Sequence, residues 1–161
     1  MCLSVNPKAD ADHPGVIAFP PLIFAACATV GILLHFVFTI RVMKHSASVS
    51  VGVFLSVVSA ALAIWAARVM KTAGTNVRPD RPTLTIVRSG PYRFTRNPMY
   101  LSLSLLQLAL GFGLDGWIPL LFALPLILIL HFGVILREER YLAAKFGEPY
   151  LAYKREVRRW L

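Results

Sequence analysis

Four long apolar runs limit what this chain can fold into. They cover residues 19–40, 49–67, 98–114 and 117–136, and none contains a Lys, Arg, Asp or Glu. A helix that spans a bilayer needs roughly 17 to 25 such residues. With 57% hydrophobic residues and a mean hydropathy of +0.63, the chain is more apolar than an ordinary soluble domain. The sequence therefore predicts an all-α integral membrane protein of one domain, residues 1–161, with four transmembrane helices arranged as two hairpins.

The basic residues predict how these helices are oriented. The net charge is +9, and most Lys and Arg residues fall within 68–96 and 137–159, just outside the second, third and fourth runs. Positively charged segments stay in the cytoplasm. We therefore expect both termini on the cytoplasmic side of a bacterial inner membrane. Membrane lipids, rather than nucleic acid, are the expected partners of these charges, and the two cysteines form no metal-binding pattern.

The polar residues between the second and third runs are expected to form a cytosolic loop, residues 70–97. Three prolines and two glycines predict that it is mostly irregular. Its β-branched stretch, residues 83–87, is expected to lie extended over a pocket.

After the fourth run, the composition predicts cytosolic or interfacial helices over residues 137–161. The first should end at Gly147 and the second should begin at Glu148, since the proline that follows is accepted in a first turn. Apolar residues then recur every three or four positions: Tyr150, Tyr153, Val157 and Trp160. This amphipathic pattern predicts that the second helix lies in the membrane interface.

The start of the third run, "TRNPMYL", combines a polar rim with a helix N-terminus. The free N–H groups and the dipole of such an end favour an anionic or hydroxyl-rich ligand. The alternative is structural: Asn97 caps the helix, Pro98 takes the first helical position, and Arg93 and Arg96 contact lipid phosphates. Both interpretations remain open from the spacing alone.

A second polar group lies where the fourth run ends. Glu138 follows His131 by seven residues, so both should project from one helical face and form a polar shaft into the membrane. The alternatives are a neutral His131 bonded to a neighbouring helix and a solvated pair of glutamates. His35, in the first run, is expected to be a packing residue. Together the two polar groups predict one site, suited to a zwitterionic cofactor and a membrane-dissolved substrate.

The motif "SGPYRFTRNPMYL", followed by "REERYLAAKFGEPYLAYKREVRRW", resembles the isoprenylcysteine carboxyl methyltransferase-like family of integral membrane methyltransferases, which is related to phospholipid N-methyltransferases. The resemblance covers about residues 84–160. It implies an S-adenosylmethionine-dependent enzyme, with S-adenosylhomocysteine as product, that methylates a lipid-soluble substrate at the cytoplasmic face. A carboxylate is the expected acceptor. The alternatives are N-methylation of a phospholipid amine, a nicotinamide-dependent enzyme similar to sterol reductases, and a non-enzymatic protein whose basic rims anchor it to lipid.

The resemblance also implies which residues form the site. Glu138 would hold the ammonium group of the cofactor, and Arg96 and Arg137 are the expected catalytic residues. Eukaryotic members have His where this chain has Asn97, and the substrate-binding arginine of the family aligns with Val134, for which Arg137 is a candidate substitute. The implied cofactor contacts are Leu84, Thr85, Ile86, Val87, Tyr92, Asn97, Pro98, Met99, Tyr100 and Glu138.

Overall fold

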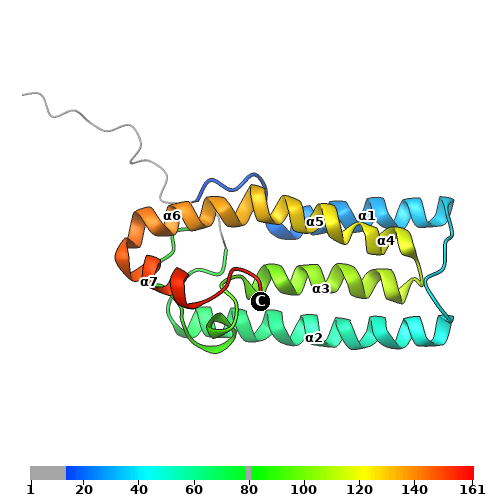
Figure 1. Ribbon diagram of the computed structural model, residues 1–161, viewed down its shortest axis with the longest axis horizontal. Coiled ribbons are helices and arrows are strands. Elements are labelled where there is room, and N and C mark those ends of the chain that lie inside the picture. The colour runs from blue at the N-terminus through cyan, green and yellow to red at the C-terminus, as the bar shows by residue number, and fades with distance from the viewer. Residues whose placement is uncertain (1–13, 79–80) are drawn as a thin grey trace, which may run out of the picture.

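The computed structural model describes residues 14–78 and 81–161, and these residues form helices and connecting segments without a β-strand (Figure 1). A 3-10 turn, η1, precedes the third helix, and a π-helical segment, η2, joins α5 to α6. The elements in chain order are α1 (Pro20–Val37), α2 (His45–Thr72), η1 (Gly90–Arg93), α3 (Pro98–Gly113), α4 (Trp117–Leu121), α5 (Ala123–Ile129), η2 (Leu130–Ile135), α6 (Leu136–Phe146) and α7 (Glu148–Glu156).

Within the described residues, three helical stretches are long and apolar enough to cross a membrane: Pro20–Val37, His45–Thr72 and the continuous rod Trp117–Phe146. Large apolar side chains such as Leu33 and Phe54 point outward and are more than half exposed, as expected for surfaces that face lipid. The all-helical membrane fold is thus confirmed. That the shorter apolar helix α3 also crosses the membrane, and that the C-terminal segment is cytosolic, stay predictions.

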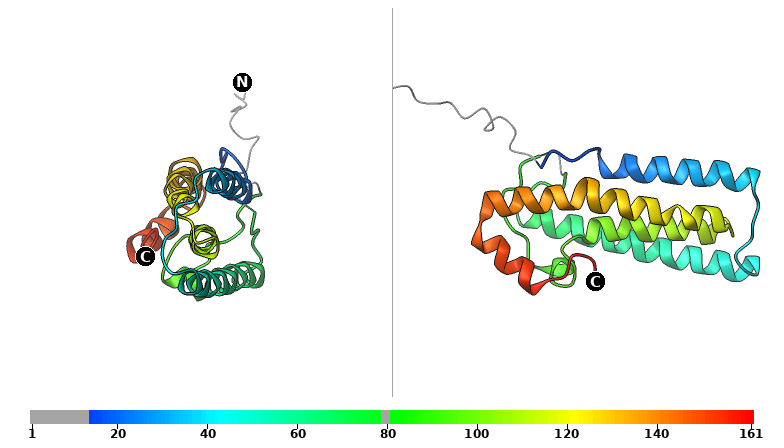
Figure 2. Two further views of the ribbon diagram at one scale, coloured as in Figure 1. Left: turned by 90° about the vertical axis from the view of Figure 1, so that its right-hand side faces the viewer. Right: turned by 45° about the horizontal axis from the view of Figure 1, so that its top comes forward.

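Helix α3 lies in the middle of the bundle, between α2 on one side and α1 with the α4–α6 rod on the other (Figure 2). Small residues let α2 and α3 approach closely. A Cβ atom at Gly52 would lie 2.6 Å from the Gly113 nitrogen and 2.9 Å from the Ala109 carbonyl oxygen. The Ser59 hydroxyl donates to the carbonyl of Ser102 at 2.7 Å, so a buried polar group also joins the two helices.

The far end of the bundle is closed by the turn between α3 and α4. Asp115 adopts a left-handed backbone conformation, φ 51°, and is buried. Its Oδ1 accepts hydrogen bonds from the backbone N–H groups of Val42 and Met43 at 3.3 and 3.2 Å, so it ties this turn to the α1–α2 connection. His35 is buried beside Gly116 in the same turn, which agrees with its expected packing role.

The C-terminal segment departs from its prediction. Helix α7 begins at Glu148 as expected, but it ends at Glu156, and Val157 is extended. Gly147, with φ 59°, reverses the chain so that α7 folds back onto the bundle. Tyr150 and Tyr153 are 3% and 4% exposed in this contact. Two of the apolar residues predicted to face the membrane interface, Tyr150 and Tyr153, thus pack on the protein itself, and the interfacial position of this helix stays a prediction.

Candidate active site at one end of the bundle

A cavity of about 280 Å³ opens at the end of the bundle opposite Asp115. This volume is at the lower end of the range for small-molecule pockets, roughly 300–1,000 Å³. Its wall combines the loop before α3, the start of α3, helices α6 and α7, and the segment that precedes α1. All but two of the residues predicted for the site line it: Thr85, Ile86, Val87, Tyr92, Arg96, Asn97, Pro98, Met99, Tyr100 and Glu138.

Leu84 and Arg137 are the two predicted residues that do not line the cavity. The side chain of Leu84 is turned outward, 61% exposed, while its N–H donates to the Thr75 hydroxyl at 3.0 Å. Arg137 is exposed, and its Nη1 donates to the carbonyl of Gly15 at 2.9 Å. The structure thus places the arginine expected to substitute for the substrate-binding one away from the other site residues.

Glu138 presents its carboxylate to the cavity. Its Oε1 accepts a hydrogen bond from the Tyr100 hydroxyl at 2.6 Å. Among the residues that the structure describes, Tyr100 is the only hydrogen-bond partner of this carboxylate. A carboxylate with so few partners beside a cavity has acceptor capacity left for a ligand.

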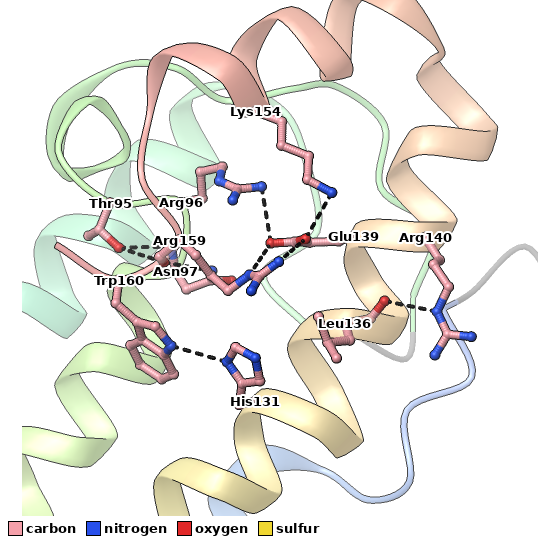
Figure 3. Close-up of polar contacts among 10 residues, drawn as sticks. All are labelled: Thr95, Arg96, Asn97, His131, Leu136, Glu139, Arg140, Lys154, Arg159 and Trp160. Atoms are coloured by element: carbon pink, nitrogen blue, oxygen red, sulfur yellow. Dashed lines mark hydrogen bonds and ion pairs between the residues drawn. The ribbon is translucent and has the colours of Figure 1, made fainter.

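Glu139, the next residue, also lines the cavity, but cationic side chains engage both of its carboxylate oxygens (Figure 3). Arg159 donates to both of its oxygens, from Nε at 2.7 Å and from Nη2 at 2.9 Å. Arg96 Nη1 lies 3.0 Å from one oxygen and Lys154 Nζ 3.2 Å from the other. The Glu139 and Arg96 side chains are only 6% and 8% exposed. This cation cluster around Glu139 joins α6, α7, the start of α3 and the chain's last residues.

The residues after α7 form a tail that crosses the start of α3. The carbonyl of Arg158 accepts from the Arg96 N–H at 3.0 Å, and the carbonyl of Arg159 accepts from Thr95 Oγ1 at 3.1 Å and from Asn97 Nδ2 at 2.9 Å. Asn97 therefore occupies the N-cap position before Pro98, as predicted, but its side chain bonds the tail instead of capping the helix. The Arg96 side chain is buried inside the protein and pairs with Glu139. The alternative prediction that Arg96 contacts lipid phosphates is therefore wrong.

His131 does not form the predicted polar shaft with Glu138. Its Nδ1 accepts from Trp160 Nε1 at 3.3 Å, and the two rings lie nearly parallel, 6.5 Å apart (Figure 3). His131 is not part of the cavity wall, whereas Glu138 is. The expectation of a shared face assumed a regular α-helix, but His131 lies within the π-helical segment η2, whose wider turns change its direction relative to Glu138.

Three tyrosines enclose the cavity from the loop and from α7: Tyr92, Tyr150 and Tyr153. The Tyr153 hydroxyl donates to the Tyr92 carbonyl at 2.7 Å, whereas the buried Tyr92 hydroxyl has no hydrogen-bond partner within the described residues. Burial raises the pKa of Tyr92 above its usual range and the pKa of Tyr150 to about 12, so both phenols are neutral near pH 7.

Three residues of the cavity wall, Tyr150, Tyr153 and Glu139, were not predicted as site residues from the sequence. The "GEPY" turn was the available signal, because a glycine before a helix start permits a chain reversal.

An apolar helical bundle with a mostly apolar cavity at one end, into which a few polar groups project, is typical of membrane proteins that bind small molecules. The sequence matches the phospholipid methyltransferase family, PEMT, over residues 47–149. The chain therefore belongs to this family of membrane methyltransferases. An uncharacterized protein of Haemophilus influenzae (strain ATCC 51907 / DSM 11121 / KW20 / Rd) is 46% identical over 63 residues, which are 39% of this chain and 100% of that protein. No solved structure matches the chain.

Proposed function

We propose that this methyltransferase uses S-adenosylmethionine and methylates a lipid-soluble acceptor at the cytoplasmic face of the membrane. The observation that carries the proposal is the cavity in which Glu138 keeps acceptor capacity beside tyrosines and a helix start. The surrounding helices are apolar enough to lie in lipid. A site between a polar loop and apolar helices gives a water-soluble cofactor and a membrane-dissolved acceptor access to the same space.

The residues of the wall fit the cofactor by their chemistry. Glu138 would accept from its ammonium group, a charge-assisted hydrogen bond stronger than a neutral one. The unpartnered Tyr92 hydroxyl offers a buried polar group to a hydroxyl or amine of the ligand. Thr85, Ile86 and Val87, which belong to the loop before α3, also line the cavity.

When bound, S-adenosylmethionine supplies an electrophilic methyl group. The chain's own residues need to align the two reactants and exclude water, which lowers the barrier without a covalent enzyme intermediate. The neutral tyrosines Tyr92 and Tyr100 are buried and polarisable, and they suit a wall beside a cationic ligand.

Arg96 is the residue that we propose to orient the acceptor. It lies on the cavity wall, and its buried Nε has no hydrogen-bond partner within the described part of the chain. This free donor favours an acceptor with an acidic group, and we propose O-methylation of a carboxylate. N-methylation of a phospholipid amine is the second candidate, because the matched family carries the name phospholipid methyltransferase and a phosphodiester would bond the same donor.

Calorimetric titration of the detergent-purified protein with S-adenosylhomocysteine tests the proposal. Glu138→Gln should weaken binding about 10- to 100-fold, since a hydrogen bond to a charged group contributes about 1.5–3 kcal/mol. Glu148→Gln is the matched control, because Glu148 is an exposed glutamate that pairs with Arg155 on α7, outside the cavity.

Absence of binding to the folded wild-type protein, or equal affinities for the two variants, would overturn the cofactor assignment. A parallel titration with a reduced nicotinamide dinucleotide tests the sterol-reductase-like alternative. Methyl transfer from labelled S-adenosylmethionine to isoprenoid or fatty carboxylates, compared with phosphatidylethanolamine vesicles, then distinguishes the two acceptor chemistries.

A further inference from the structure

We name the six residues before α1, 14–19, the strap. They run beside the rod Trp117–Phe146 before the chain enters α1 (Figures 1 and 2). Pro14 and Phe19 of the strap line the cavity, together with Glu138 of the rod. The strap lies outside the part of the chain that matches the family, residues 47–149, and nothing in the function proposed above assigns it a role.

The first anchor of the strap is at η2. The Ile17 N–H donates to the carbonyl of Gly133 at 3.3 Å. A Cβ atom at Gly133 would lie 2.3 Å from Ile17 Cδ1 and 2.8 Å from Cγ1, whereas the next neighbour, Ile129 Cγ2, is 3.9 Å away. Among the described residues, Ile17 of the strap therefore makes the closest approach to Gly133 and occupies the space that a side chain there would need. Short π-helical segments such as η2 are rare and often occur at functional sites.

The second anchor is Arg137. This exposed arginine donates from Nη1 to the carbonyl of Gly15 at 2.9 Å, and Gly15 has a φ of +59° that a residue with a side chain rarely adopts. Between the two anchors, Val16 packs against the buried core cluster that includes Tyr100 and Val134. Backbone, side-chain and apolar contacts thus fix the strap at three successive residues.

A third contact joins the strap to the loop on the other side of the cavity. The guanidinium carbon of Arg78 lies 5.4 Å from the centre of the Phe19 ring, within the range of a cation–π interaction. Arg78 and Phe19 both line the cavity. The strap consequently spans from the rod to the loop, along the cavity's edge.

We infer that the strap closes one wall of the cofactor cavity, and that Gly133 and Arg137 are positioning residues that hold it there. The effect of the strap on cofactor binding rests on the proposed function, whereas the docking of the strap against the rod does not. Arg137 then acts through Gly15 and the strap, and it contacts neither reactant. A fixed apolar wall excludes water and lipid from the cavity, which strengthens the polar contacts made inside it.

The test compares Gly133→Ala with Gly113→Ala, in the full chain purified in detergent. An added methyl group at Gly113 meets nothing within 4 Å, so this variant is a matched control. Hydrogen exchange, read by mass spectrometry on the peptide that contains Ile17, reports strap docking, and titration with S-adenosylhomocysteine reports the cavity. Gly133→Ala should speed exchange of this peptide about tenfold and weaken the ligand about tenfold, whereas the control should change neither.

A second substitution separates displacement of the strap from general damage. Ile17→Ala removes the atoms that an alanine at Gly133 would meet, so the double variant Ile17→Ala, Gly133→Ala should bind S-adenosylhomocysteine more tightly than Gly133→Ala alone. Arg137→Gln should show a smaller increase in exchange, because the Ile17 bond remains. Fast exchange with unchanged affinity in Gly133→Ala would overturn the wall role, and unchanged exchange would overturn the docking. Failure of the wild type to bind would count against the proposed function only, since exchange is measured without ligand.

Discussion

The two ends of the bundle both bury carboxylates, but they use them differently. At the far end, Asp115 bonds the backbone of Val42 and Met43 and closes a turn. At the cavity end, Glu139 is surrounded by Arg96, Lys154 and Arg159. Within the described part of the chain, its neighbour Glu138 accepts a single hydrogen bond, from Tyr100. Burial alone therefore does not mark a functional carboxylate. The informative property is how much of its hydrogen-bonding capacity the protein itself uses.

The largest effect on stability is expected from Glu139→Gln. The substitution leaves the buried Arg96 without its ion-pair partner and removes the charge that holds Arg159, which should lower the free energy of unfolding by about 3 kcal/mol. Thermal unfolding in detergent measures the loss. Glu156→Gln is the control, because this glutamate is 66% exposed and lies 3.9 Å from Arg88.

The same variant should release the tail. Trypsin cleaves after arginine, and the backbone hydrogen bonds of the tail hold Arg158 and Arg159 in place. Cleavage after these residues should therefore be faster in Glu139→Gln than in the wild type, and unchanged in Glu156→Gln. If both variants melt and cleave like the wild type, the cation cluster is not what holds the cavity end together, and the contrast between Glu139 and Glu138 fails.

An intermediate effect is expected from Asp115→Ala at the far end. The variant loses the acceptor for two backbone N–H groups and places alanine at a positive φ, so its melting temperature should fall, though less than that of Glu139→Gln. Its affinity for S-adenosylhomocysteine should equal that of the wild type. Asp115→Asn keeps an acceptor oxygen and tolerates the backbone conformation, and it should melt close to the wild type. A loss of affinity in a folded Asp115→Ala would show that the two ends are coupled.

The smallest effect is expected from Tyr92→Phe, which should weaken S-adenosylhomocysteine about fivefold without loss of stability. The hydroxyl is buried and has no partner within the described residues, so its removal costs no hydrogen bond in the free protein. A ligand bonded to it would lose about 1 kcal/mol. Calorimetry and thermal unfolding on the same sample measure both quantities. A variant that is less stable but binds equally well would assign the hydroxyl to the fold.

Local patterns predicted the helices, and most of the residues that they predicted for the site lie on the cavity wall. The apolar runs predicted α1, α2, α3 and the helical rod from α4 to η2 within a few residues, and the composition after residue 136 predicted α6. The helix start at Pro98 brought Asn97, Met99 and Tyr100 to the site as expected. These features depend on hydropathy and on residues adjacent in sequence. Both are visible in a single chain.

The remaining parts of the site depend on contacts between distant segments. The bonds from Thr95 and Asn97 to Arg159 join residues 64 and 62 positions apart, and no spacing rule relates such pairs. The expected pairing of His131 with Glu138 failed for another reason, because a π-helical segment is a local departure from the period on which helical-face arguments depend. The direction of α7 after Gly147 was likewise set by tertiary packing.

The tail has a consequence for the order of folding. The contacts between the helices of the bundle can form as the chain is made, but the backbone N–H of Arg96 and the side chain of Asn97 receive their acceptors only when residues 158 and 159 arrive. Closing so long a loop has an entropic cost that must be met before the new contacts form. The cavity end should therefore be the last part of the molecule to reach its native structure, and the first part to unfold when the protein is warmed.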